Sequence, residues 1–198
     1  MQVPPRLYSE PPRYGASNTK KTLLIVLTSI AGAFLLCCVG GAVLIWRAGF
    51  SDGLACYDLA NKERYREAIP HCRTLVQQIP RSSGAHNELG WCLALVGEGP
   101  ESVSECRKAV ELEPIRNHYD SLAMALAVSG KGEEALQIEK EHVIINGKLA
   151  NASELVTLGM VYYSVGRKED AHSAWERART SSSAMARNLA TEFEAKHP

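Results

Sequence analysis

Three columns of recurrent residues constrain this chain of 198 residues more than any other feature. Small residues form the first column at intervals of 34, 33 and 36 positions: Cys56, Gly90, Ala123 and Gly159. A second small residue follows each of these twelve positions later: Ala68, Ser102, Ala135 and Ala171. The third column is large and apolar: Leu59, Leu93, Leu126 and Tyr162. Self-similarity at such a period is typical of repeat architectures.

The period has a simple structural meaning. A unit of about 34 residues accommodates two helices of about 12 to 14 residues and two short turns. Small residues twelve positions apart then lie on facing helices of one hairpin, where they let the two backbones approach closely. Gly97, Gly130 and Gly166 fall where the first helix of a unit should end in a left-handed residue. Pro80 and Pro114 fall where the second helix should stop.

These units resemble the tetratricopeptide repeat. The best matches are Leu89-Gly90, Leu93, Ser102, Ala109 and Pro114 in one unit, and Leu158-Gly159, Tyr162, Ala171, Trp175 and Ala178 in another. The units cover residues 50–82, 83–115, 116–150 and 151–183. The resemblance implies an all-α fold: a right-handed α-solenoid of about four helical hairpins over 50–183. Met185, Leu189 and Phe193 predict a capping helix over 184–198.

The third unit departs from the pattern of the family. It has Glu139 and His142 where the family prefers apolar residues, and extra residues around 144–150 lengthen the link to the fourth unit. The packing of its second helix is therefore the least predictable part of the fold. The carboxylate pairs Glu133/Glu134 and Glu139/Glu141 are expected on a solvated helix face.

A run without charged residues over 23–46 predicts a transmembrane helix within residues 22–47. At 1.5 Å per residue the run spans about 36 Å, enough for a hydrocarbon core of about 30 Å. Cleavage as a signal peptide near Ala31-Gly32-Ala33 would leave an apolar N-terminus, which favours an uncleaved anchor. Basic residues are denser before the span than directly after it, which predicts a cytoplasmic N-terminus and an extracytoplasmic repeat domain. Residues 1–21 have four prolines and predict a disordered tail.

The resemblance also implies a binding surface. In this family the first helices of successive units line a concave groove that binds an extended peptide or a helix. The corresponding residues here are Tyr57, Asn87, Trp91, Asp120, Met124, Val156, Met160 and Tyr163. Their aromatic and thioether side chains suit the burial of apolar side chains of a partner. The alternative is that the protein covers this column itself, for example with the segment 184–198.

The cysteines of the first two units form a second constellation. Cys56 and Cys72 lie almost symmetrically about the turn of their hairpin, and Cys92 and Cys106 nearly so. In an extracytoplasmic domain these pairs predict two disulfides, one in each hairpin. The alternative is that the four residues are buried small hydrophobes, a common role of free cysteine.

The remaining features indicate a binding protein and not an enzyme. The sequence has 22 basic and 22 acidic residues, so no net charge recruits nucleic acid. It has no metal-ligand motif, no phosphate-binding loop and no nucleophile elbow, and we expect no metal and no cofactor. The sequence thus predicts a membrane-anchored scaffold or assembly factor that binds an apolar peptide or helix of a protein partner. The alternative is a structural membrane protein that only associates with copies of itself.

Overall fold

The computed structural model describes residues 51, 53–144, 148–149 and 151–197, all within one compact unit, Ala48–Pro198. The predicted tail 1–21 and the predicted membrane span 23–46 lie outside the described residues. None of the described helices is both long and apolar enough to span a bilayer.

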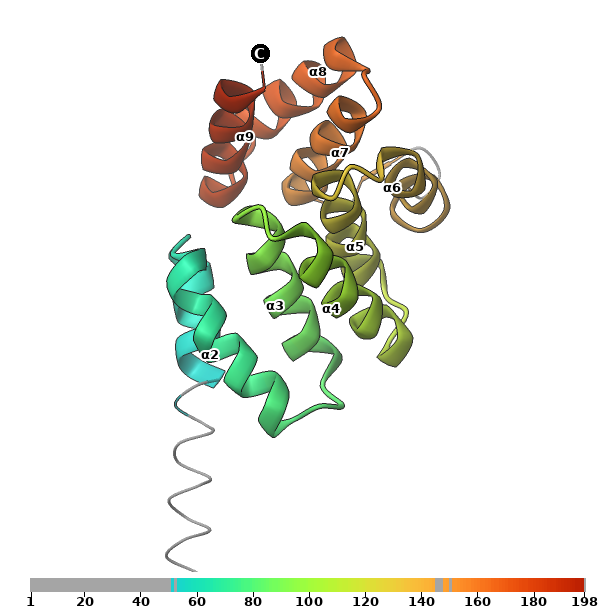
Figure 1. Ribbon diagram of the computed structural model, residues 1–198. Helices are drawn as coiled ribbons and strands as arrows, with labels where there is room; N and C mark the ends of the chain where they lie inside the picture. The colour runs from blue at the N-terminus through green and yellow to red at the C-terminus, as the bar shows by residue number, and fades with distance from the viewer. Residues whose placement is uncertain (1–50, 52, 145–147, 150, 198) are drawn as a thin grey trace, which may run out of the picture. The chain divides into compact units, whose positions relative to one another are not determined.

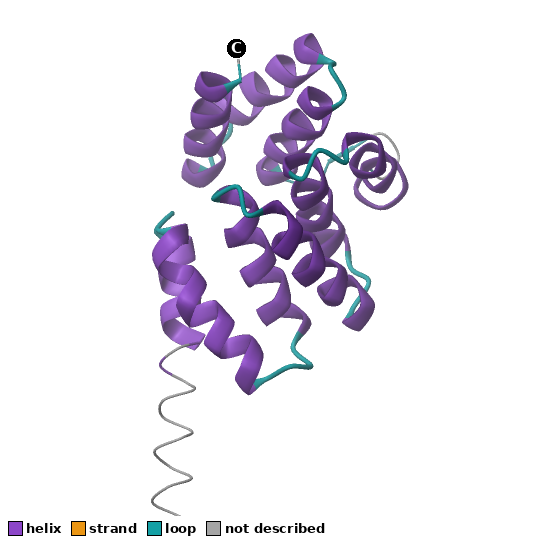
Figure 2. Cartoon of the chain, viewed as in Figure 1, coloured by secondary structure: helices purple, strands orange, loops and turns teal. Residues whose placement is uncertain are grey.

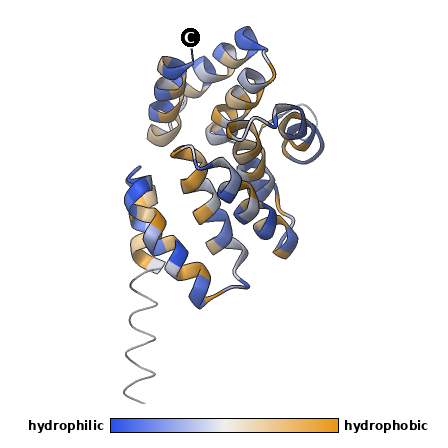
Figure 3. Cartoon of the chain, viewed as in Figure 1, coloured by the Kyte–Doolittle hydropathy of each residue, from blue (hydrophilic) through white to orange (hydrophobic). Residues whose placement is uncertain are grey.

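The described residues form an all-α fold without strands, as predicted (Figure 2). After a helical segment at 53–61, the helices are α2 (Tyr65–Gln78), α3 (Ser83–Leu95), α4 (Gly99–Leu112), α5 (Arg116–Val128), α6 (Gly132–Ile138), α7 (Ala152–Ser164), α8 (Lys168–Arg179) and α9 (Ala184–Lys196) (Figure 1). A π-helical turn, η1 (Glu139–Val143), continues α6. Each helix mixes hydrophobic and hydrophilic residues, as expected for helices with one buried face (Figure 3).

The turns form where the sequence predicts them. Gly97, Gly130 and Gly166 have φ angles of 86°, 75° and 80°, the left-handed conformation that ends a helix at low steric cost. Pro80 and Pro114 lie just after the ends of α2 and α4. The fold is therefore a series of helical pairs separated by short turns.

The small residues bring paired helices together as expected. The Ser102 hydroxyl donates to the Gly90 carbonyl at 2.7 Å, so α4 lies directly against α3. In the last pair, Gly159 of α7 faces the indole of Trp175 on α8, and a Cβ at Gly159 would clash with that ring. Trp175 is fully buried, and its Nε1 donates to the Val156 carbonyl at 3.2 Å.

The first helices of successive pairs also pack on one another. Helix α3 contacts α5, α5 contacts α7, and α7 contacts α9. We call α3, α5, α7 and α9 the inner helices. Helices α2, α4 and α8 pack on the inner helices next to them in sequence. The inner helices thus form a continuous row, and side chains from several of them meet on its surface.

Candidate partner-binding surface

The residues predicted to line a groove lie on the segment 53–61 and on α3, α5 and α7. Tyr57 is exposed to 39%, and Tyr163 is partly buried. The other six are buried: Asn87, Trp91, Asp120, Met124, Val156 and Met160. Most of the predicted column therefore contributes to the core and not to an open surface.

A hollow on the inner helices has a volume of about 800 Å³. We call it the large hollow. Its apolar lining comes from the C-terminal halves of the inner helices and the residues that follow them: Ala94, Leu95, Val96, Ala127, Val128, Met160, Tyr163 and Phe193. Met160 and Tyr163 belong to the predicted groove, whereas the others do not. The sequence contains a signal for two of these residues. Val96 directly precedes the turn glycine Gly97, and Val128 lies two positions before the turn glycine Gly130.

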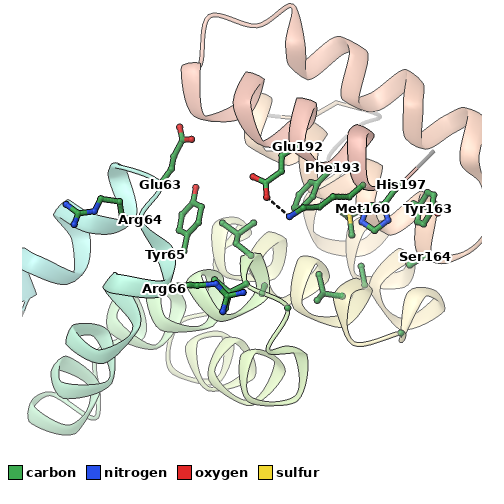
Figure 4. A pocket seen from close by; sticks show the side chains of 18 of the residues that line it. Glu63, Arg64, Tyr65, Arg66, Met160, Tyr163, Ser164, Glu192, Phe193 and His197 are labelled. Atoms are coloured by element: carbon green, nitrogen blue, oxygen red, sulfur yellow. Dashed lines mark hydrogen bonds and ion pairs between the residues drawn. The ribbon is translucent and has the colours of Figure 1, made fainter.

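The walls of the large hollow come from residues far apart in the sequence. Residues 63–67, which comprise the turn before α2 and its first residues, form one wall, and Glu192, Phe193, Lys196 and His197 form another (Figure 4). Asn188 of α9 joins the two walls, because its Nδ2 donates to both carboxylate oxygens of Glu63 at 2.9 and 3.1 Å. The final helix thus reaches back to the first helical pair.

Charged and polar groups line the rim of the large hollow. Arg64 pairs with Glu67, and Lys196 pairs with Glu192. Arg66 is exposed at the same rim. The hydroxyl of Tyr65 is buried there without a hydrogen-bond partner, and burial raises the pKa of this phenol. An apolar interior with a charged rim is the usual anatomy of a protein-binding site.

A second hollow, of about 170 Å³, lies nearer the N-terminal ends of the inner helices. We call it the small hollow. Its lining includes Asn87 and Trp91 of α3 and Asp120 of α5, all three from the predicted groove, together with Met185 of α9. Asn87 and Asp120 are only 8% and 4% exposed, and neither Asn87 Oδ1 nor Asp120 Oδ1 accepts a hydrogen bond. Two buried acceptors therefore lack a donor.

Two carboxylic acids of the small hollow titrate near neutrality. Burial raises the pKa of Glu88 to about 7. Burial also raises the pKa of Asp120 to about 7. The nearby Thr157 hydroxyl and the positive charge of Arg116 act to lower this pKa, and the negative charge of Glu154 acts to raise it. The hollow is thus more negatively charged above pH 7 than below it.

Glu139 is not on a solvated face, which corrects one expectation from the sequence. Its side chain is 0% exposed, and neither carboxylate oxygen has a hydrogen-bond partner. The π-helical turn η1 begins at this residue, next to Asp120 and to the buried Glu154, which pairs with Arg116 at 2.7 Å. Burial, together with the charges of Asp120 and Glu154, raises the pKa of Glu139 to about 9 despite the opposing charge of Arg116. Glu133, Glu134 and Glu141 are exposed, as expected.

One of the two predicted cysteine pairs forms a disulfide, and the other does not. Cys56 and Cys72 form a disulfide with their Cα atoms 4.9 Å apart. Cys92 and Cys106 are free and buried, and burial raises the pKa of both thiols to about 12. Cys106 Sγ occupies the space next to Gly90, so this thiol fills the interface between α3 and α4.

No group of three or more His, Cys, Asp or Glu side chains in the described ranges is arranged to hold a metal ion. Comparison with known proteins adds no assignment, because no protein-family model matches the chain and no curated protein is significantly similar to it.

Proposed function

We propose that the chain is a membrane-anchored adaptor whose helical pairs form a tetratricopeptide-like solenoid and bind an apolar peptide or helix of a protein partner. The large hollow is the observation that carries this proposal. Its volume of about 800 Å³ exceeds the needs of one side chain, and its apolar lining comes from four inner helices. We expect the partner to insert two or more apolar side chains there.

The remaining parts of the proposal rest on the sequence and on one covalent bond. The uncharged run 23–46 supports the anchor. The basic residues before the run and the Cys56–Cys72 disulfide both support a repeat domain outside the cytoplasm. The period of about 34 residues and the hairpin turns at Gly97, Gly130 and Gly166 support the tetratricopeptide-like solenoid.

Site-specific photo-crosslinking in membranes tests the proposal. A photoreactive phenylalanine analogue replaces Tyr163, which lines the large hollow, in the full chain. The matched control replaces Tyr119, a tyrosine of similar exposure that stacks on His142 with ring centroids 3.9 Å apart, away from this hollow. We expect an adduct with a different protein from position 163 and none from position 119.

A second variant links the adduct to the apolar lining. Val128→Gln places an amide in the large hollow, and Val110→Gln makes the same change on α4, outside it. The adduct at position 163 should fall several-fold with Val128→Gln and persist with Val110→Gln. An adduct composed of two copies of this chain would instead support a self-associating structural protein. Absence of any adduct at position 163 would overturn the proposal.

A further inference from the structure

The small hollow is lined by groups that attract positive charge. Its lining residues are Asn61, Asn87, Glu88, Trp91, Asn117, Asp120, Ser121, Ser153 and Met185, and none of these nine is basic. Two are carboxylic acids, three are amides, two are hydroxyl side chains, and one is an indole, whose face attracts cations.

The unpartnered acceptors indicate that a ligand supplies hydrogen-bond donors. Asn87 and Asp120 come from neighbouring inner helices and line the same hollow. The Oδ1 atom of each is buried and has no hydrogen-bond partner. A buried acceptor without a donor is unfavourable in the free protein, because it has lost its hydrogen bonds to water. A guanidinium or ammonium group supplies several donors together with a charge, and it carries no acceptor that would compete for them.

We propose that the small hollow binds a basic side chain, arginine or lysine, of the polypeptide whose apolar residues occupy the large hollow. This inference rests on the proposed function for the source of the cation. A volume of about 170 Å³ suits one side chain and not a helix. Trp91 supplies an aromatic surface for the cation, and Asp120 and Glu88 supply its counter-charge.

The distance between the hollows sets the spacing in the partner. Asp120 lines the small hollow and Val128 the large one, and both belong to α5. Eight residues of helix span about 12 Å. An extended peptide advances about 3.3 Å per residue, so the basic residue lies about four positions from the apolar anchor.

Titration of the full chain in detergent micelles with ethylguanidinium tests the charge preference. The readouts are the NMR signals of the Trp91 indole N–H and the Asn87 side-chain amide. We expect saturable shifts with ethylguanidinium and none with urea, which donates similar hydrogen bonds without charge. Equal binding of urea, or no binding of either probe, would overturn the inference.

Variants assign the effect to the small hollow. Asp120→Asn removes one charge from a crowded group of carboxylic acids and should leave the fold intact while weakening ethylguanidinium at least tenfold. Asp58→Asn makes the same change at an exposed residue that pairs with Lys62 outside the hollow, and should change nothing. Asn87→Leu offers a second variant that removes an acceptor. Unchanged affinity in both hollow variants would contradict the site.

A peptide distinguishes a side chain of a partner from a free small cation. The probe acetyl-Leu-Ala-Ser-Ala-Arg-amide should bind at least tenfold more tightly than ethylguanidinium. Val128→Gln should abolish that gain without weakening ethylguanidinium itself. If the peptide binds no better than the free cation, the polypeptide source is wrong. Cation binding without any crosslink from position 163 would leave the site standing while the proposed function fails.

Discussion

Asn188 hydrogen-bonds both carboxylate oxygens of Glu63, a residue 125 positions earlier in the chain. This contact connects the final helix to the turn that begins the second helix of the fold. Glu63 lines the large hollow, and Asn188 belongs to α9, whose residues Glu192, Phe193 and Lys196 line the opposite wall. The contact therefore helps to fix the distance between the two walls.

Asn188→Asp should loosen this connection, because two carboxylates would then face each other. Loss of an exposed hydrogen bond of this kind costs about 0.5–1.5 kcal/mol. Hydrogen exchange measured by mass spectrometry should show faster exchange in α9. The double variant with Glu63→Lys should restore protection by forming a pair of opposite charge. Unchanged exchange in the single variant would show that α9 is held by its apolar face alone.

Glu139→Gln should stabilise the protein, and the gain should grow with pH. The pKa of Glu139 in the fold, about 9, lies above its ordinary value of 4.5. The folded state therefore binds more protons than the unfolded state between these values, and its stability falls as pH rises through this window. The melting temperature of Glu139→Gln minus that of the wild type should increase from pH 5 to pH 9. Glu133→Gln, at an exposed position on α6, should give a nearly constant difference.

Gly159→Ala should destabilise the protein by about 1–3 kcal/mol, because the added methyl group meets the buried Trp175 indole. Gly84→Ala is the matched comparison. Its added Cβ meets only the Tyr57 hydroxyl at 3.4 Å, an ordinary contact, and alanine favours helix α3 by about 0.5–1 kcal/mol. Chemical denaturation should therefore move in opposite directions for the two variants. A similar change for both would contradict the close packing of α7 on α8.

Removal of the disulfide by Cys56→Ser with Cys72→Ser should lower stability by about 3 kcal/mol. The bond joins residues 16 positions apart.

Cys92 and Cys106 should resist alkylation in the folded protein, because burial raises the pKa of both thiols to about 12. Peptide mapping after alkylation, with and without denaturant, should show Cys92 and Cys106 labelled only on unfolding. Labelling of Cys56 or Cys72 without a reductant would contradict the bond.

Binding of ethylguanidinium should weaken several-fold between pH 8 and pH 6. The pKa of Glu88 and that of Asp120 are both raised to about 7, so both carboxylates lose charge over this range. Asp120 faces Arg116 on its own helix, Glu139 on η1, and Glu154 and Thr157 on α7. Glu88 faces Tyr57, Tyr65 and Cys92, which stay neutral at these pH values. Affinity that does not depend on pH would exclude both carboxylates from the site.

The periodic parts of the fold were predictable because each repeat obeys the same local rules. Turn glycines, proline stops and small residues twelve positions apart predict the helical pairs. The hydrogen bond from Ser102 to the Gly90 carbonyl confirms the spacing of twelve. The burial of Trp91 was not predictable from its column, because the neighbouring inner helices together leave it only 9% exposed. The burial of Glu139 agrees with the helical register, because the buried Ala135 and Leu136 precede it by four and three positions and lie on the same helix face. Its charge alone predicts a solvated face.

The large hollow also constrains the order in which the molecule becomes competent to bind. Most helix contacts join neighbours in sequence, and such contacts form early and fast. The contact between Glu63 and Asn188 must close a long loop, so we expect it among the last to form. During synthesis the hollow is incomplete until residues 192–197 have left the ribosome. A nascent chain is therefore not expected to bind a ligand in the large hollow before α9 has emerged and folded.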